Sequence, residues 1–352
     1  MNPYIIPLFI PHYGCRHQCS FCNQKSITGV KEPVSARQVE AVIQEHLARP
    51  RRPRPVEVAF YGGSFTALEP RLQQQLLEPA ACFLTTGRIQ AIRLSTRPDC
   101  LEKATIENLR QYGVTTVEMG VQSLDDKVLA LAERGHSAEV VAAAAQRLRQ
   151  AGLSIGIQLM PGLPGEDWPS LIGTVWQTAK IRPDFVRIYP TLVLTGTALA
   201  DWFRAGRYLP LSLDDAVQRC AYMKLYFSRQ GIPVIRTGLQ DTEELRQPET
   251  IKAGPFHPAF GEMVEAELYY IMLAHCLEKA FDVPAGAAVD IWYPVREGSK
   301  MRGVGNHNVQ RLKQRFALGE LRLHPENLPS GQFVLQGERL RYVINKNMIC
   351  QI

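Results

Sequence analysis

The segment Ile5-Ile-Pro-Leu-Phe-Ile10 leads directly into Pro-His-Tyr-Gly14-Cys15-Arg-His-Gln-Cys19-Ser-Phe-Cys22-Asn23. The first six residues form an apolar run with the length of a buried strand, and a polar loop with three thiols follows it. In folds of parallel strands and helices, the loops at the carboxyl ends of the strands gather on one side and carry the chemistry. The cysteines therefore indicate on which side of the sheet the site lies.

The same alternation of a short β-like run and a helical stretch continues to about residue 235. We expect six strands, at 5–10, 56–61, 89–95, 115–121, 154–159 and 184–189. Helical stretches lie between them, near 35–48, 70–84, 100–112, 137–151 and 168–181. Sequential βα units of this kind build an α/β fold, either an open sheet or a full or partial barrel. The alternation alone does not distinguish between these architectures.

The pattern changes after Pro233. A Gly- and Pro-rich stretch is followed by a helix near 263–281, a strand at 287–293 and a basic helix near 306–318, and we expect two closing strands after them. We interpret this part as a smaller α+β extension. The sequence therefore predicts two domains, residues 1–240 and residues 241–352.

Positive charge is concentrated near the end of the sequence. Residues 300–352 hold nine Lys and Arg against three Glu, which accounts for the net charge of +6. Such a region suits an RNA partner, because phosphate contacts supply most of the affinity that does not depend on base sequence. The alternative is an ordinary solvated surface on a basic protein. A second basic group, Arg49-Pro-Arg51-Arg52-Pro-Arg54, is interpreted as a surface loop between a helix and a strand.

The N-terminal apolar run is interrupted by prolines and is too short for a membrane span or the core of an export signal. We therefore expect a cytoplasmic protein that does not contact a membrane. Cytosolic reductants keep thiols reduced, so the eight cysteines are not expected to form a disulfide framework.

The spacing CxxxCxxC of Cys15, Cys19 and Cys22 predicts an iron–sulfur cluster. A [4Fe–4S] cluster with three thiolate ligands leaves one iron open to an external chelator. The amino and carboxylate groups of S-adenosylmethionine (SAM) can occupy that position, where an electron from the cluster can break a carbon–sulfur bond. The alternative is a zinc site with His12 or His17 as the fourth ligand.

Several motifs follow the strands in order. They are Tyr61-Gly-Gly-Ser64, Ser95-Thr-Arg-Pro-Asp99, Glu118-Met-Gly-Val-Gln122-Ser123, Arg134-Gly-His136, Gln158-Leu-Met-Pro-Gly-Leu-Pro-Gly165 and Ile188-Tyr-Pro-Thr-Leu192. With the cysteines, this set resembles the radical SAM superfamily. The likeness is to the radical SAM half of Elongator protein three over about residues 5–210, and more distantly to oxygen-independent coproporphyrinogen dehydrogenase. The resemblance implies a partial (β/α)6 TIM-like barrel with a smaller C-terminal α+β extension.

The resemblance also implies which residues contact SAM. They are Phe21, Gly62, Gly63, Ser64, Ser95, Gln122, Arg134 and Gln158. Phe21 would lie near the adenine, the glycine pair would receive the methionyl amine through backbone oxygen, and Arg134 could bind the carboxylate as a cationic fork. Ser95 stands where these relatives usually carry Glu. An exposed position at a helix end is the alternative for Arg134.

Tyr189, at the end of the sixth strand, would face the substrate and could donate a proton or stack on a base. Packing is the alternative role for this tyrosine. The leading hypothesis is that the SAM-derived 5′-deoxyadenosyl radical modifies a tRNA nucleoside of the wobble-uridine type. An external one-electron donor of the flavodoxin or ferredoxin type would reduce the cluster. Acetyl transfer is not expected, because no Gly-rich pyrophosphate-type loop follows residue 240.

Two further hypotheses stay open. One is a radical SAM oxidoreductase that acts on a small metabolite, with the basic region incidental. The other is a non-catalytic iron–sulfur or zinc protein that binds RNA or another partner. Co-purification of tRNA would separate the first hypothesis from the metabolite enzyme, and cleavage of SAM would exclude the non-catalytic protein.

Overall fold

The computed structural model describes residues 3–10, 15, 17–23, 34–50, 52–239, 242–280, 284–336 and 341–345. The chain divides into two compact units, each built from two segments. The first unit contains Met1–Leu211 and Leu239–Pro255, and the second contains Ser212–Gly238 and Phe256–Ile352.

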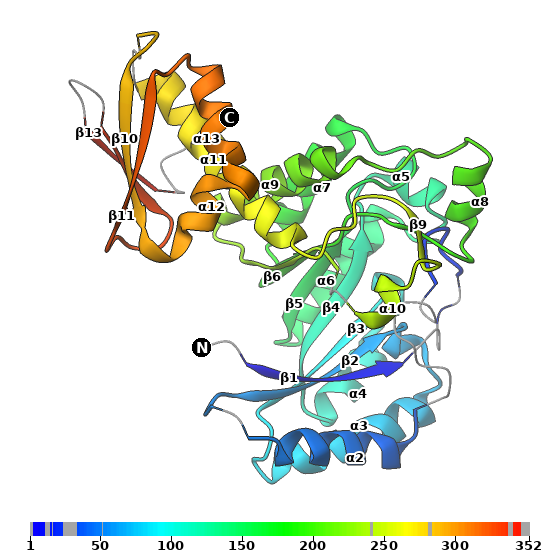
Figure 1. The fold of residues 1–352 in the computed structure, drawn as a ribbon. Coiled ribbons are helices and arrows are strands. Elements are labelled where there is room, and N and C mark those ends of the chain that lie inside the picture. The colour runs from blue at the N-terminus through cyan, green and yellow to red at the C-terminus, as the bar shows by residue number, and fades with distance from the viewer. Residues whose placement is uncertain are drawn as a thin grey trace. The chain divides into compact units, whose positions relative to one another are not determined.

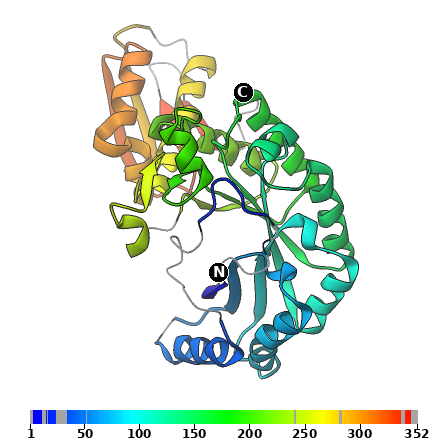
Figure 2. The same ribbon diagram turned by 90° about the vertical axis from the view of Figure 1, so that its right-hand side faces the viewer.

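Seven strands form the main sheet, in the order β1-β2-β3-β4-β5-β6-β8. They are β1 (Tyr4–Ile10), β2 (Val56–Gly62), β3 (Ala91–Thr96), β4 (Val114–Gln122), β5 (Ser154–Leu159), β6 (Phe185–Ile188) and β8 (Val234–Thr237). Each strand from β1 to β6 pairs in parallel with the next along the chain. The sheet curls into a half-barrel (Figures 1 and 2), which confirms the predicted fold class. The additional strand β8 has only four residues, so its sequence pattern is weak.

Helices cover the outer face of this sheet in the first unit (Figure 2). They include α2 (Ala36–Ala48), α3 (Pro70–Thr85), α4 (Lys103–Gln111), α6 (Ala138–Gln150) and α7 (Trp168–Ile181). The shorter helices α5 (Asp126–Leu131) and α8 (Ala198–Arg204) instead pack against the cysteine loop. In α2 the Ser35 hydroxyl accepts from Gln38 N at 3.3 Å and closes a capping box, while Val39 and Ile43 bury one stripe. The five helical stretches expected between the strands are thus confirmed.

Side chains alternate between the two faces of each strand. In β3, Ile92 and Leu94 are fully buried, whereas Arg93 and Ser95 point to the opposite face. The parallel register places Ser95 opposite Glu118 of β4, so polar residues of neighbouring strands share that inner face. A short pair, β7 (Val193–Leu194) with β9 (Ile251–Ala253), completes the strands of the first unit.

The second unit contains a four-stranded sheet in the order β11-β10-β12-β13. Its elements are α9 (Leu213–Arg229), α11 (Phe260–Ala280), β10 (Ala288–Pro294), α12 (Gly298–Arg302), α13 (His307–Arg315), β11 (Glu320–Glu326), β12 (Gln332–Gln336) and β13 (Arg341–Asn345). A buried core that includes Tyr269, Leu273, Ile291 and Phe333 joins α11 to the sheet. The α+β extension is therefore confirmed, with one more closing strand than expected.

Candidate radical SAM site

Three cysteines lie in the loop after β1, at the carboxyl end of the sheet. Cys19 is buried, Cys15 and Cys22 are half-buried, and no disulfide joins any of the described cysteines. Cys22 N donates to Cys19 O at 3.1 Å, which makes a tight turn between these two residues. The loop therefore carries the three thiols at the carboxyl end of the sheet, which is the side that the sequence predicted.

Backbone hydrogen bonds attach this loop to two helices. Ser20 N donates to Ala132 O at 3.2 Å at the end of α5, and Leu199 N of α8 donates to Ser20 O at 2.8 Å. Asn23 Nδ2 donates to Thr195 O at 2.6 Å, in the turn before α8. Hydrogen bonds therefore attach the loop to the end of α5 and to the beginning of α8.

Phe21 also anchors the loop, through apolar packing. Its ring is buried in a cluster with Val128, Leu163, Leu199 and Tyr208. The expected contact of Phe21 with the adenine of SAM stays a prediction.

Two glycines allow close approaches that a side chain would block. Gly62 has φ of +102°, and an added Cβ would lie 3.0 Å from Ile10 O. Its neighbour Gly63 donates its N–H to the same Ile10 oxygen at 2.6 Å. Gly135 has φ of +71°, and a Cβ there would lie 2.7 Å from the ring of His17. The glycine of Tyr61-Gly-Gly and the glycine of Arg134-Gly-His thus fix the start and the middle of the cysteine loop.

Arg134 points at the cysteines from the segment after α5. Its Nη1 donates to Cys19 Sγ at 3.0 Å, its Nη2 donates to Gly120 O, and only 4% of the residue is exposed. Arg97 lies beside it, donating to Arg134 O and to Asp99 Oδ1 at 2.9 Å. The alternative of an exposed Arg134 is therefore wrong. Arg97 belongs to the quoted Ser-Thr-Arg-Pro-Asp motif, but its sequence position alone did not single it out.

The donor set fits an iron–sulfur cluster. A cluster held by thiolates is electron-rich, and guanidinium groups next to Cys19 stabilise negative charge on sulfur. Burial raises the pKa of the Cys15 thiol, while the Ser64 N–H and the charges of Arg97 and Arg134 act in the opposite direction.

The spacing of the side chains bears on the zinc alternative. Within the described part of the chain, no three His, Cys, Asp or Glu side chains group closely enough to hold a single metal ion. Tetrahedral zinc with Zn–S bonds of about 2.3 Å needs such a group. In a [4Fe–4S] cluster each cysteine binds its own iron, so the three sulfurs lie farther apart.

Ser64 connects the ends of β2 and β3. Its hydroxyl is fully buried, bonds to Thr96 Oγ1 at 2.9 Å and accepts from Arg97 N at 3.2 Å. The side chain therefore holds Arg97 in place, and a contact of Ser64 with SAM stays a prediction.

Gln122 has an unusual backbone. Its φ of +74° lies in the left-handed region, where the register of β4 with β5 shifts between Gly120 and Gln122. Such strain in a residue other than glycine is typical of functional sites. Gln158 Nε2 donates to Gln122 Oε1 at 3.4 Å, so the structure brings these two predicted SAM contacts together. Ser95 shares the inner face with them.

The inner face also carries a charged network that sequence reasoning missed. Glu118 of β4 is 5% exposed and pairs with Arg93 Nη1 at 3.2 Å and with Arg187 Nε at 2.7 Å. Arg93 also pairs with Glu57. The available signal was a charged residue in the middle of an otherwise apolar strand, as in Val117-Glu118-Met119. Such charges are rarely buried without partners, so a charged residue in one buried strand predicts a residue of opposite charge in a neighbouring strand.

Two tyrosines complete this network and differ in their hydrogen bonds. Tyr61 OH donates to Glu118 Oε1 at 3.2 Å and accepts from Arg187 Nη2 at 3.1 Å. Tyr189 OH accepts from Arg187 Nη1 at 3.3 Å, and no described residue accepts the Tyr189 proton. Burial and Glu118 raise the pKa of Tyr61. Tyr189 is thus the phenol whose proton is available to another molecule.

The basic helix expected to contact RNA is α13, and its arginines have partners within the second unit. Arg311 pairs with Glu267 and stacks over the Tyr270 ring at 3.6 Å. Arg315 pairs with Glu278 at 3.0 Å. Two arginines of this helix therefore have carboxylate partners in the second unit, which the sequence pattern could not show.

Comparison with known proteins agrees with this geometry. Residues 9–175 match the Radical SAM superfamily, and residues 183–270 match the Radical_SAM C-terminal domain. The chain therefore belongs to the radical SAM superfamily and is an enzyme.

Among characterised relatives, the chain is similar to a tRNA uridine(34) acetyltransferase of Dehalococcoides mccartyi strain CBDB1. The two are 42% identical over 139 residues, which is 38% of this chain and 30% of that protein. Human Elongator complex protein 3 is 32% identical over 41% of this chain and 28% of its own length. The chain thus spans less than a third of each of these two relatives.

A solved structure supports the fold. The archaeal Methanocaldococcus infernus Elp3, with an N-terminal deletion, superposes with a TM-score of 0.60 at 23% identity. The match covers 80% of this chain and 68% of that one. Among the described residues, no helix is both long and apolar enough to cross a membrane.

Proposed function

We propose that the protein cleaves SAM reductively at a [4Fe–4S] cluster and uses the resulting 5′-deoxyadenosyl radical to modify a nucleoside of tRNA, at a wobble uridine. The observation that carries the proposal is the cysteine loop, in which the buried guanidinium of Arg134 donates to Cys19 Sγ at 3.0 Å. The tRNA substrate is supported by the names of the relatives, which match about two fifths of this chain. We place the protein in the cytoplasm, where tRNA is found.

The chain's own residues have distinct roles in this proposal. Cys15, Cys19 and Cys22 hold the cluster, and the Arg134 guanidinium donates a hydrogen bond to Cys19 Sγ. The strained Gln122, oriented by Gln158, presents polar groups to the ribose of SAM. The backbone of Gly62 and Gly63, together with Ser64, Ser95 and Phe21, lines the rest of the SAM site.

Tyr189 is proposed as the group that contacts the substrate. Arg187 positions its phenol, because the guanidinium donates to Tyr189 OH and is itself held by Glu118. A donor aimed at the substrate can supply a proton or a hydrogen bond at the atom that gains an electron. The same guanidinium binds Tyr61, but the Tyr61 proton already goes to Glu118.

The first test is an anaerobic assay. The protein is reconstituted with iron and sulfide, reduced with dithionite in place of a flavodoxin or ferredoxin, and given SAM with and without bulk tRNA. We expect 5′-deoxyadenosine in both cases and more of it with tRNA. Cys19→Ala should abolish it. Formation that is indifferent to tRNA would point to a small metabolite, and none in a cluster-loaded sample would refute the reductive cleavage.

A second test separates Tyr189 from the SAM site. Tyr189→Phe should leave uncoupled SAM cleavage within about threefold and lower tRNA modification by about 100-fold, as for loss of a general acid. Tyr61→Phe is the matched control, because it removes a phenol from the same guanidinium. Equal losses of modification in the two variants would contradict the assignment of Tyr189.

A further inference from the structure

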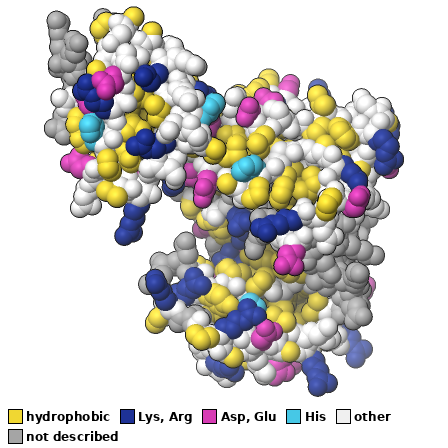
Figure 3. All heavy atoms as spheres, in the orientation of Figure 1, with side chains coloured by type: hydrophobic (Ala, Val, Ile, Leu, Met, Phe, Trp, Pro, Cys, Tyr) yellow, Lys and Arg dark blue, Asp and Glu magenta, His cyan; other side chains and the backbone are white. Residues whose placement is uncertain are grey.

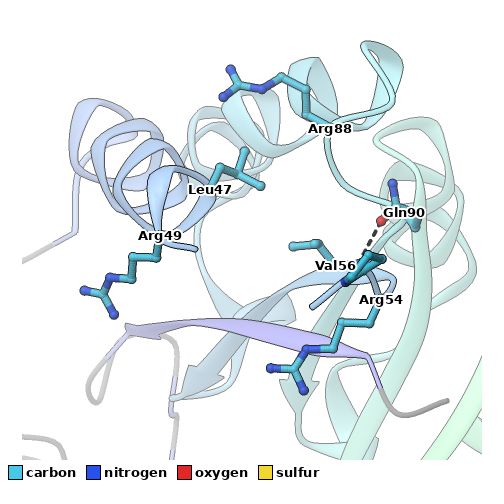
Figure 4. A pocket seen from close by; sticks show the side chains of 7 residues that line it. Leu47, Arg49, Arg54, Val56, Arg88 and Gln90 are labelled. Atoms are coloured by element: carbon cyan, nitrogen blue, oxygen red, sulfur yellow. Dashed lines mark hydrogen bonds between the residues drawn. The ribbon is translucent and has the colours of Figure 1, made fainter. Parts of the chain in front are cut away.

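A cleft lined by three arginines lies in the first unit, at the amino ends of β2 and β3. It has a volume of about 500 Å³, and we name it the arginine cleft. Its lining residues are Leu47, Arg49, Pro53, Arg54, Val56, Arg88 and Gln90. Figure 4 shows the three arginines around Leu47 and Val56. The arginines come from three separate segments: the end of α2, the loop before β2 and the loop before β3.

The charge of this cleft is little neutralised. Arg54 lies over the Tyr4 ring at 5.0 Å and Arg88 over the Phe83 ring at 4.9 Å, contacts that orient a guanidinium without cancelling its charge. Only Arg49 has a carboxylate partner, Glu45, and both of these side chains are more than half exposed. None of the described residues that line the cleft is Asp or Glu. Figure 3 shows Lys and Arg side chains gathered over the start of β1 and the loop before β2.

The remaining polar group of the lining is already used. Gln90 Oε1 accepts from Val56 N at 2.7 Å, and Gln90 Nε2 donates to Gly87 O at 3.0 Å. Among the described lining residues, the guanidinium groups are therefore the polar groups that this cleft offers to a ligand.

The arrangement suits a chain of phosphates better than a single anion. In Figure 4 the guanidinium groups of Arg49, Arg54 and Arg88 do not converge on one point but stand around the opening. Leu47, Pro53 and Val56 are the apolar residues of the lining. A single phosphate would need convergent donors, whereas an RNA strand offers successive phosphates to separated cations and lays its sugars and bases on the apolar part.

We propose that the arginine cleft binds the sugar–phosphate backbone of the RNA substrate at a distance from the chemistry. This inference rests on the proposed function. Val56 and Gly62 are the two ends of β2, so the cleft lies about 20 Å from the SAM site along the strand, at 3.3 Å per residue. Binding there raises the affinity for RNA and leaves SAM cleavage without RNA unchanged.

The test uses the full chain and fluorescein-labelled bulk tRNA, with Kd measured over a range of salt concentrations. The cleft variant replaces Arg49, Arg54 and Arg88 with Gln. The control variant replaces Arg302, Lys313 and Arg315 with Gln, which removes the same formal charge from the second unit. We expect the cleft variant to raise Kd at low salt by about tenfold or more and to lower the salt slope by about two to three, against less than about threefold in the control.

The outcomes separate the inference from the proposed function. If wild-type protein binds tRNA and the cleft variant keeps the same Kd and slope, the arginine cleft is not an RNA site, while the proposed function stands. Equal weakening in both variants would show a general charge effect and also overturn the inference. Wild-type protein that does not bind tRNA would refute the RNA substrate itself. Displacement of tRNA by millimolar inorganic phosphate at constant ionic strength would show a single-anion site and contradict binding of a strand.

Discussion

The two ends of the curved sheet both carry arginines, but in opposite environments. At the carboxyl ends of the strands, Arg134 and Arg97 are each 4% exposed and their guanidinium groups bond to Cys19 Sγ, Gly120 O and Asp99. At the amino ends, Arg54 and Arg88 are exposed and lie over aromatic rings. The buried charges are therefore part of the fold and the site, whereas the exposed charges are available to a partner.

The largest effect is expected between these ends, at the inner-face network. Glu118→Gln removes the negative charge that faces both Arg93 and Arg187 while keeping the shape of the side chain. Removing the carboxylate that two buried cations share should lower the free energy of unfolding by about 3 kcal/mol. Urea denaturation measures it. Glu45→Gln removes the exposed partner of Arg49 and should leave the free energy of unfolding nearly unchanged, because solvent screens an exposed ion pair. Similar costs for the two variants would contradict the difference between buried and exposed arginines.

The next effect concerns catalysis at the carboxyl end. Arg134→Gln removes the donor to Cys19 Sγ and the positive charge beside the cluster. We expect SAM cleavage to fall by about 100-fold, since a charge-assisted hydrogen bond in a buried site contributes about 3 kcal/mol. The measurements are iron content and 5′-deoxyadenosine formation without tRNA. Arg88→Gln is the matched control and should change neither. Normal cleavage by Arg134→Gln would remove this arginine from the site.

The sequence predicted those features whose residues lie close together in the chain. Cys15, Cys19 and Cys22 fall in one short loop, and β-like runs that alternate with helical stretches mark strands β1 to β6, which have four to nine residues. Partners distant in the chain could not be assigned in the same way. Glu118 meets Arg93 and Arg187 only because parallel register aligns the four neighbouring strands β3 to β6. Nothing in the separate strand sequences states that register.

The basic helix α13 shows a second limit of prediction from sequence, which concerns surface charge. Counting charges predicted a surface that contacts RNA, but the count cannot tell whether Arg311 faces solvent or Glu267 of α11. Conversely, Arg88 is 34 residues beyond Arg54 in the sequence and was not grouped with the basic loop. Folding places both in one cleft. Charge patterns thus indicate where cations occur, and tertiary structure decides which of them are neutralised.

Two histidines test the electrostatic difference between the two ends of the sheet, with a smaller expected effect. Burial, with Arg134 and Arg97, lowers the pKa of His136 to about 4. The unfolded state therefore binds more protons between about pH 6.5 and pH 4, and stability falls as pH falls through this window. We expect a loss of about 2 kcal/mol from His136 between pH 7 and pH 5, which His136→Gln removes in urea denaturation.

The matched residue near the arginine cleft is His46. Burial and Arg49 lower its pKa, but Glu45 acts in the opposite direction, and the His46 ring is less buried than that of His136. An NMR titration should therefore find His136 neutral at a pH where His46 is already protonated. If His46 stays neutral to a lower pH than His136, the proposed electrostatic difference between the two ends of the sheet is contradicted.

The smallest effect is expected in α13. This helix contains one arginine whose carboxylate partner is buried and one whose partner is exposed. Arg315 and Glu278 are 46% and 53% exposed, so Arg315→Gln should change the free energy of unfolding by less than about 0.5 kcal/mol. Arg311→Gln should cost about 1 kcal/mol, because Glu267 is only 11% exposed and Arg311 also stacks on Tyr270. If denaturation finds no cost for either variant, Arg311 is not held by its partner in solution, and α13 returns as a candidate for binding RNA.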